Sequence, residues 1–179
     1  MVYPAGQWEI DPTHSEVGFS VKHLMISKVK GSFGSFSGEI VTTENPLETT
    51  VEGSVDVTSI NTNDKNRDNH LRSADFFDTE NFPYMHFKST KIEHVKDEKY
   101  ILTGELTIKG VTKEIKLDTT FNGIAVDPYG QTKAAVEATG KINRTDFGLK
   151  WNQVLDNGAG LLVSEEVNLI LEAQAVLQK

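Results

Sequence analysis

The chain has no cysteine among its 179 residues. This absence excludes disulfide bonds, thiolate zinc sites and a cysteine nucleophile. An excess of basic residues is also missing, because 18 Lys and Arg stand against 26 Asp and Glu and give a formal net charge of −8. Nucleic-acid binding needs a concentrated basic surface, so that function is not expected. The same negative charge disfavours docking on anionic membranes by charge alone.

Long apolar runs and export signals are missing too. The longest apolar stretch, around residues 158–163, is far shorter than the roughly 20 residues that span a bilayer, so no membrane span is expected. Residues 1–15 show no basic segment followed by an apolar one, so no export signal is visible. These features predict a cytoplasmic location, or a periplasmic or extracellular one if the chain is a processed form.

What the chain does contain is alternation with a period of two. Residues 132–142 carry an apolar or small residue at every second position, and residues 111–121 alternate apolar with charged residues. Such alternation is typical of half-buried antiparallel strands. Many inward positions are small, namely Gly53, Gly104, Ala134, Ala138, Gly140, Ala173 and Ala175. These positions predict a β-barrel around an unfilled apolar space that binds a ligand, or room for Phe and Trp side chains from opposite strands.

Turn residues divide the chain into candidate strands. The expected strands are 7–10, 16–23, 31–42, 50–60, 84–92, 100–109, 111–122, 132–142 and 160–177. The last segment also fits a helical stripe, but its β-rich context favours a strand. A short helix is expected at about 64–73, near the capping residues Asn61 and Asn63, and tight turns are expected at 109–110 and 127–130. The fold class is therefore all-β, an antiparallel barrel of about eight strands in one domain over residues 1–179.

Several short motifs follow one another in an order typical of one family. They are Trp8-Glu9-Ile10-Asp11-Pro12, Phe19-Ser20-Val21-Lys22-His23, Gly31-Ser32-Phe33, Ser59-Ile60-Asn61-Thr62, Arg67-Asp68-Asn69-His70-Leu71-Arg72-Ser73, Asp75-Phe76-Phe77-Asp78, Phe87-Lys88-Ser89-Thr90, Gly104-Glu105-Leu106-Thr107-Ile108-Lys109-Gly110 and Asn143-Arg144-Thr145-Asp146-Phe147-Gly148. Through them the chain resembles the YceI-like family over nearly its whole length. The resemblance implies a lipocalin-like barrel whose lumen holds an elongated amphiphile, such as a polyisoprenoid or an isoprenoid quinone. Many members carry an export signal and reside in a bacterial periplasm, whereas this chain shows no such signal.

The candidate ligand-binding residues combine inward apolar positions with a few polar side chains. The predicted set is Phe19, Val21, His23, Phe33, Phe36, Val55, Leu71, Phe76, Phe77, Phe87, Leu106, Ala138, Arg72 and Arg144. His23 ends an apolar face, where it would meet a polar head at the barrel mouth or bond to the backbone. Arg67 and Arg72 would clamp a diphosphate, or they belong to a solvated face on which Asp68 and Arg72 pair. Arg144 is expected to form a hydrogen-bonded corner in preference to a ligand contact.

Signs of catalysis are weak. Asp11, His14 and Ser15 suggest a triad, but adjacent strand residues point to opposite faces and no Gly-x-Ser-x-Gly elbow is present. The spacing of the histidines suggests no metal site, and no phosphate loop or dinucleotide fingerprint occurs. The sequence therefore predicts a non-enzymatic protein, without cofactor or metal, that binds, stores or transports a long-chain isoprenoid or similar amphiphilic lipid. The alternatives are an enzyme that modifies such an amphiphile and an interaction module with a filled barrel, and a homodimer is compatible with each.

Overall fold

The computed structural model describes residues 3–153 and 163–179. Within them the strands are β1 (Gly6–Ile10), β2 (Glu16–His23), β3 (Ser27–Phe33), β4 (Phe36–Thr42), β5 (Thr50–Asp56), β6 (Ile60–Asn61), β7 (Tyr84–Lys96), β8 (Lys99–Ile108), β9 (Val111–Val126), β10 (Thr132–Asn143) and β11 (Val163–Leu177). The other elements are the helix α1 (Lys65–Arg72) and the 3-10 turns Pro12–His14, Pro46–Glu48, Val57–Ser59 and Arg144–Phe147. The predicted all-β class with one short helix is confirmed.

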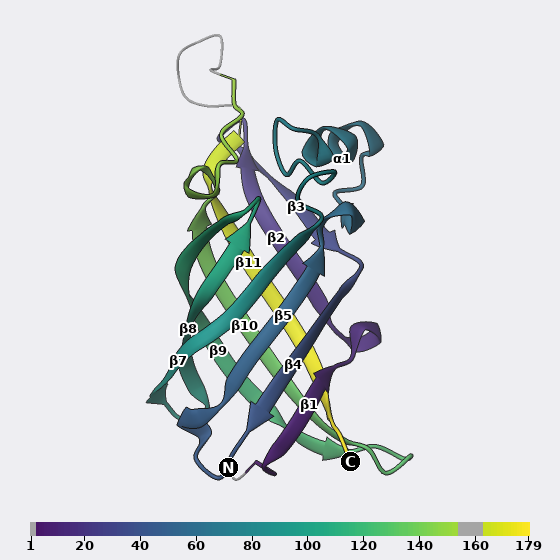
Figure 1. Cartoon of the computed structure of the whole chain (residues 1–179), viewed down its shortest axis with the longest axis vertical. Helices are drawn as coiled ribbons and strands as arrows, with labels where there is room; N and C mark the ends of the chain where they lie inside the picture. Colours follow the sequence, from purple (N-terminus) through teal and green to yellow (C-terminus); the bar gives the residue numbers. More distant parts are fainter. Residues whose placement is uncertain (1–2, 154–162) are drawn as a thin grey trace.

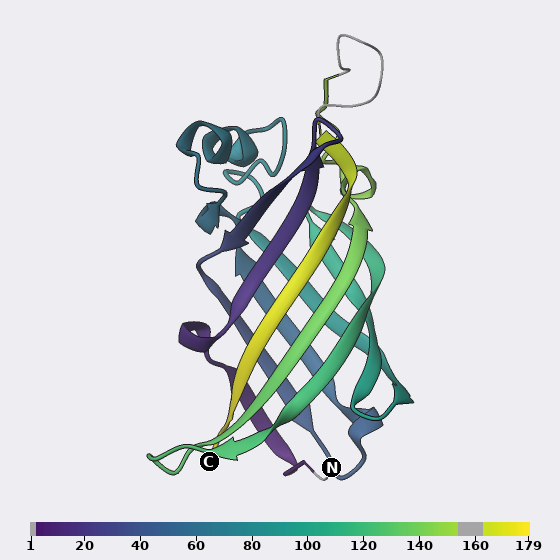
Figure 2. The ribbon, with the colours of Figure 1, turned by 180° about the vertical axis from the view of Figure 1, so that it is seen from behind.

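The strands close into an antiparallel barrel (Figures 1 and 2). Neighbouring strands follow the order β1-β4-β5-β7-β8-β9-β10-β11, and β11 pairs back onto β1. The pairs Trp8↔Leu177 and Ile10↔Ala175 complete this closure. The ring therefore has eight strand positions, a size whose interior is filled by side chains or holds one small ligand.

In the N-terminal half of the chain, a turn or short loop separates β1 from β2, β3 from β4 and β5 from β6. Strands β1 and β2 both pair with β11, β1 near its C-terminal end and β2 along its earlier part. The turn Pro12–His14 separates them. The predicted strand 31–42 likewise proves to be two strands, β3 and β4, which Gly34 and Ser35 separate. Breaks of this kind bend the chain and ease the closing of a sheet.

The predicted strand 50–60 also ends early, for a local reason. The Asp56 carboxylate accepts a hydrogen bond from the backbone N–H of Thr58 at 3.0 Å and so begins the turn Val57–Ser59. Only the two-residue strand β6 resumes after this turn. The C-terminal segment is a strand as predicted, and its expected first residues, 160–162, lie outside the described residues.

The helix α1 starts where a side chain can cap it. The Asp64 carboxylate accepts a hydrogen bond from the backbone N–H of Arg67 at 3.1 Å. Asp64 is therefore the N-cap, not the expected Asn61 or Asn63, because its spacing to Arg67 is that of a capping contact. In the described part of the chain, no helix is long and apolar enough to cross a membrane.

Both expected tight turns are present. Lys109 and Gly110 join β8 to β9 with φ of 51° and 75°, as in the hairpin turns that match strand twist. The Asp127 carboxylate accepts hydrogen bonds from the backbone N–H groups of Tyr129 and Gln131, each at 2.9 Å, and closes the turn between β9 and β10. These turns fix which side chains of the neighbouring strands face inward.

Candidate ligand-binding site

The barrel encloses a cavity of about 390 Å³. Its lining is almost wholly aliphatic and aromatic, and residues from every strand position contribute to it. The inward residues come from alternate positions, such as Val51 and Val55 on β5 or Leu169 and Leu171 on β11. A volume of this size falls within the roughly 300–1,000 Å³ of small-molecule pockets. The interior is therefore able to receive an apolar ligand.

At the end of the barrel where the two termini lie (Figure 1), the aromatic side chains of Tyr3, Trp8 and Phe121 line the cavity. Trp8 is only 2% exposed, and its indole N–H donates to the hydroxyl of Thr42 at 2.9 Å. The ring of Tyr3 meets that of Phe121 edge-on, with centroids 3.9 Å apart. Burial, with further contributions from Tyr100 and Glu98, raises the pKa of Tyr3.

The opposite end is covered by α1 and the segment that follows it (Figures 1 and 2). Phe76 and Phe77 turn into the lining, and Leu71 of α1 joins them. Phe76 packs against the ring of Trp151 with centroids 5.4 Å apart. The residues after the helix therefore contribute aromatic rings to this end of the barrel, whereas Phe82 packs beside Gly110.

The small residues on inward faces divide into two groups. At Gly104 and Gly140 the space is already taken, because an added Cβ would lie 2.4 Å from Cζ of Phe87 and 2.8 Å from Cδ2 of Leu117, respectively. At other positions the space is open to the cavity, and these lining residues are Gly53, Ala134, Ala138, Ala173 and Ala175. Some of the small residues therefore make room for side chains of neighbouring strands, as at Gly104 and Gly140. The others border the cavity and leave part of the lumen unfilled.

The structure brings most of the predicted ligand-binding residues together around this cavity. Those that line it are Phe19, Val21, Phe33, Phe36, Val55, Leu71, Phe76, Phe77, Phe87, Leu106, Ala138 and Arg144. His23 does not line the cavity, and Val21 is the last residue of β2 that does. The backbone carbonyl of His23 instead accepts a hydrogen bond from the N–H of Ile26 at 3.2 Å.

Arg72 is likewise outside the cavity lining, because its guanidinium holds α1 against the barrel rim. It donates to the backbone carbonyls of Thr58 at 2.9 Å and Ile60 at 3.1 Å. Arg67 does the same with the carbonyl of Thr62 at 2.7 Å. The two arginines therefore form no diphosphate clamp, and the suggested pairing of Asp68 with Arg72 is replaced by hydrogen bonds from Thr62 to Asp68.

Arg144 forms the hydrogen-bonded corner that the sequence favoured. The residue is 4% exposed, and it donates to the backbone carbonyls of Leu149 at 2.7 Å and Trp151 at 2.9 Å. It also donates to those of Val163 at 3.2 Å and Ser164 at 2.9 Å. Burial lowers the pKa of Arg144, but a guanidinium keeps its proton in proteins. The result is a buried positive charge at the α1 end of the cavity lining.

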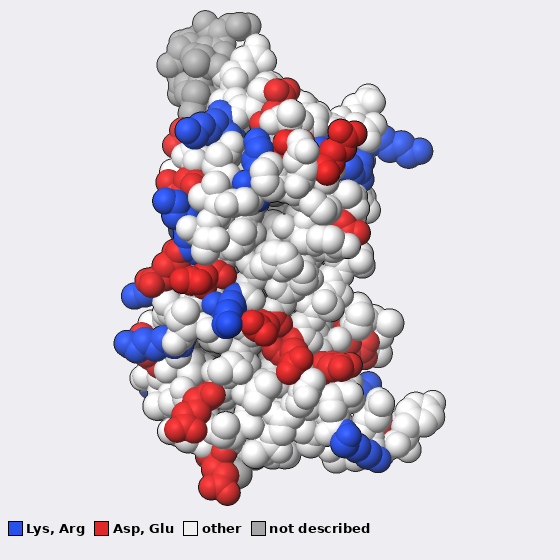
Figure 3. Space-filling model, viewed as in Figure 1, with Lys and Arg blue, Asp and Glu red and all other residues white. Residues whose placement is uncertain are grey.

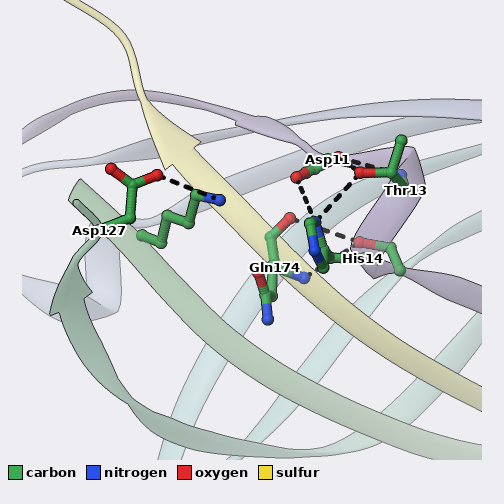
Figure 4. Close-up of polar contacts among 7 residues, drawn as sticks. Asp11, Thr13, His14, Asp127 and Gln174 are labelled. Carbon is green, nitrogen blue, oxygen red and sulfur yellow. Dashed lines mark hydrogen bonds and ion pairs between the residues drawn. The ribbon is translucent and has the colours of Figure 1, made fainter. Parts of the chain in front are cut away.

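The suggested triad residues do not form a relay. His14 Nδ1 lies 2.8 Å from Oδ2 of Asp11, and the Thr13 hydroxyl donates to Oδ1 of Asp11 at 2.7 Å (Figure 4). Hydrogen bonds from Thr13 and His14 lower the pKa of Asp11 to about 2. Ser15 instead accepts a hydrogen bond from the backbone N–H of Gln174 at 3.0 Å. The cluster therefore anchors the break between β1 and β2 to β11.

The sequence reasoning missed several lining residues. Tyr3 precedes every expected strand, so no alternation marked it. Met85, Leu102 and Ile115 also line the cavity, and each occupies an inward position of a strand that was expected. Period-two alternation alone would have found these three residues, because each shares the inward parity of its strand.

A closed antiparallel barrel around an apolar cavity defines this chain as a lipocalin-like barrel. Its family follows from the sequence match. Residues 8–175 match the model of the YceI-like domain, and the chain belongs to this family. A UPF0312 protein of Photorhabdus laumondii is 38% identical over 96% of this chain and 85% of the relative.

Solved structures share the same barrel. The YCEI protein of Campylobacter jejuni is 34% identical and gives a TM-score of 0.73 over 88% of this chain and 90% of that one. A polyisoprenoid-binding domain from Saccharophagus degradans gives a TM-score of 0.71 at 16% identity over 98% of this chain and 100% of that one. The second likeness concerns the fold alone.

Proposed function

We propose that this protein binds an elongated amphiphile of the polyisoprenoid or isoprenoid-quinone type in its barrel and stores or carries it without changing it chemically. The observation that carries the proposal is the apolar cavity between the buried Trp8 and the α1 end. An apolar tail gains roughly 25 cal/mol for each Å² that it removes from water. The polyisoprenoid-binding domain of Saccharophagus degradans, which has the same fold, supports this choice of ligand class.

The charge distribution around the cavity favours one orientation of the ligand. The Trp8 end is lined by aromatic rings, which suit the tail. At the α1 end Arg144 directs its hydrogen bonds to neutral backbone carbonyls. Its positive charge, which Glu165 partly offsets, attracts an electronegative head group, such as a quinone carbonyl or a phosphate. The tail then points toward Trp8 and the head toward Arg144.

Carriage is favoured over chemistry by the partners of the candidate catalytic groups. Ser15 exchanges hydrogen bonds with the backbone of Gln174, so its hydroxyl has no adjacent general base. His14 is more than half exposed and pairs with Asp11 outside the lumen. A nucleophile needs a base within hydrogen-bond reach, and this arrangement does not supply one to the lumen.

A displacement assay tests the proposal. The protein, purified without detergent and delipidated, is loaded with a dye that fluoresces in apolar surroundings and is then titrated with prenyl alcohols of increasing length. Affinity should rise with tail length until the cavity is full and then level off. Tails brominated at the far end should quench Trp8 more than tails brominated near the head. If no prenyl alcohol displaces the dye, or if the affinity does not depend on tail length, the proposal is wrong.

A further inference from the structure

The loop between β2 and β3 exposes three consecutive apolar side chains. Leu24 is 38% exposed, Met25 50% and Ile26 85%. We call residues 24–26 the apolar tip. Figures 1 and 2 show this loop at the same end of the barrel as α1 and far from the two termini. Strand β2 leads from this loop to the cavity, because its Val21 lines it.

The backbone of the apolar tip is held in an unfavourable conformation. Leu24 and Met25 both have positive φ, of 54° and 63°, and the N–H of Ile26 donates to the carbonyl of His23. Hairpin turns with two left-handed residues are normally made from Asn and Gly, because other side chains are strained there. Folding preference therefore does not account for Leu and Met at these positions. Strain kept at an exposed site points to a function for the side chains.

The strands beside the apolar tip carry a cluster of lysines. Lys22 and Lys28 face each other in register, and Lys30 lies on the same outer face. Like charges directly opposite one another destabilise a strand pair, so the cluster also opposes local stability. Within the described residues none of the three lysines forms an ion pair. No Asp or Glu occurs between Glu16 and Glu39, although the whole chain carries a net charge of −8.

The acidic groups nearest to this cluster in the sheet lie on β11, the other neighbour of β2. There Glu166 lies 4.0 Å from Lys141. On the barrel wall seen in Figure 3, acidic side chains lie across the middle and also near the α1 end, interspersed with basic ones. The β2–β3 hairpin is locally basic, because residues 17–38 contain three lysines and no acidic residue.

We propose that the apolar tip inserts into the interface of an anionic lipid bilayer while Lys22, Lys28 and Lys30 contact the lipid head groups. Apolar side chains flanked by lysines match the two parts of such an interface, the acyl boundary and the anionic surface. Docking in this way would bring the α1 end of the barrel to the membrane surface. The inference goes beyond lipid binding in the lumen and does not depend on it.

Vesicle flotation tests this proposal. The wild-type chain is mixed with vesicles of phosphatidylcholine, with or without phosphatidylglycerol, and should float only with the anionic vesicles and less so in high salt. Leu24→Asn/Met25→Gly and Ile26→Ser should reduce flotation at least ~10-fold. Replacing the three lysines by Gln should reduce it ~100-fold, since each lysine near an anionic surface contributes roughly fivefold.

The loop between β9 and β10 provides a matched control. Tyr129 is 90% exposed there, at the opposite end of the barrel, but it lies beside Asp127 and no strained apolar residue accompanies it. Tyr129→Ser should float like the wild type. Circular dichroism and urea unfolding check that each variant is folded, and Leu24→Asn/Met25→Gly should be at least as stable as the wild type because its turn is relieved of strain.

The chain has no cysteine, so a single Ile26→Cys variant can carry a polarity-sensitive fluorophore. Its emission should shift to the blue on addition of anionic vesicles, while the same label at Tyr129→Cys should not respond. Failure of the wild type to float, or equal flotation of the variants of the apolar tip, would overturn the proposal. The proposal would also be overturned if the wild type formed a dimer that did not bind vesicles and that the variants of the apolar tip converted to monomers. The vesicles contain no isoprenoid, so failure here would leave the proposed lumen ligand standing.

Discussion

The substitution Ala138→Leu tests whether the cavity is the binding site. Ala138 lies on the inward face of β10, directly opposite Leu171 of β11, and lines the cavity. Leucine adds three carbon atoms to this wall. The neighbouring strand leaves room for them, because Ala138 borders open space, unlike Gly104, where Phe87 already fills the position.

The expected magnitudes follow from the volume that the new side chain occupies. Three added carbons displace a similar length of the bound tail, and each CH₂ contributes about 0.8 kcal/mol. Ligand affinity should therefore fall by about 2 kcal/mol, which is about 30-fold in Kd. The free energy of unfolding should change by less than about 1.5 kcal/mol, because the burial of the new methyl groups offsets the cost of tighter packing.

Both quantities are measured on the same preparations, by dye displacement with one prenyl alcohol and by urea unfolding. Thr139→Leu is the matched control, because Thr139 is the next residue of β10 and is exposed on the outer face. It should bind the alcohol with wild-type affinity. Equal affinity of Ala138→Leu and the wild type, with both folded, would refute the assignment of the lumen as the binding site.

Three further changes have expected results. Gly104→Ala should destabilise the fold by about 1–3 kcal/mol in urea unfolding, because its Cβ would lie 2.4 Å from Phe87. Arg144→Leu should cost at least about 3 kcal/mol in the same assay, because four buried or half-buried carbonyls lose the hydrogen bonds that its guanidinium donates. Asp11→Asn should flatten the acid dependence of stability. Because folding lowers the pKa of Asp11 from 3.8 to about 2, its stabilisation is complete above pH 3.8 and is lost as the pH falls toward 2.

Each of these expectations has a contrary outcome. An unchanged unfolding midpoint for Gly104→Ala would mean that Phe87 does not occupy the space above that glycine. If Arg144→Leu is as stable as the wild type, the carbonyls of the corner find other donors. Parallel stability curves for Asp11→Asn and the wild type between pH 2 and pH 5 would show that the pKa of Asp11 is not lowered by folding.

The long strands could be predicted because one face of each is buried and the other is exposed to solvent. In β9, for example, Ile115 and Leu117 alternate with Glu114 and Lys116. The breaks in the N-terminal strands could not be placed in the same way. They depend on single contacts such as the hydrogen bond that Asp56 accepts, and an Asp within an alternating run is compatible with an uninterrupted strand.

The sequence allowed us to predict which faces of the strands line the cavity, but not which positions on those faces border open space. Ala138 and Gly104 give the same signal in the sequence, yet one borders the cavity and the other lies under Phe87. Which of them is filled depends on a ring from the neighbouring strand. The polar residues show the same limit, because the roles of Arg72 and His23 depend on backbone carbonyls and strand length that alternation does not encode.

The most direct test of the account is to identify what the protein holds when it is purified without detergent. The purified chain is extracted with organic solvent, and the extract is analysed by mass spectrometry. The account predicts a near-stoichiometric isoprenoid or similar long-chain amphiphile, with much less of it in Ala138→Leu. An extract without such a lipid, followed by no uptake of an added fluorescent prenyl lipid, would contradict it and favour an interaction module with a filled barrel.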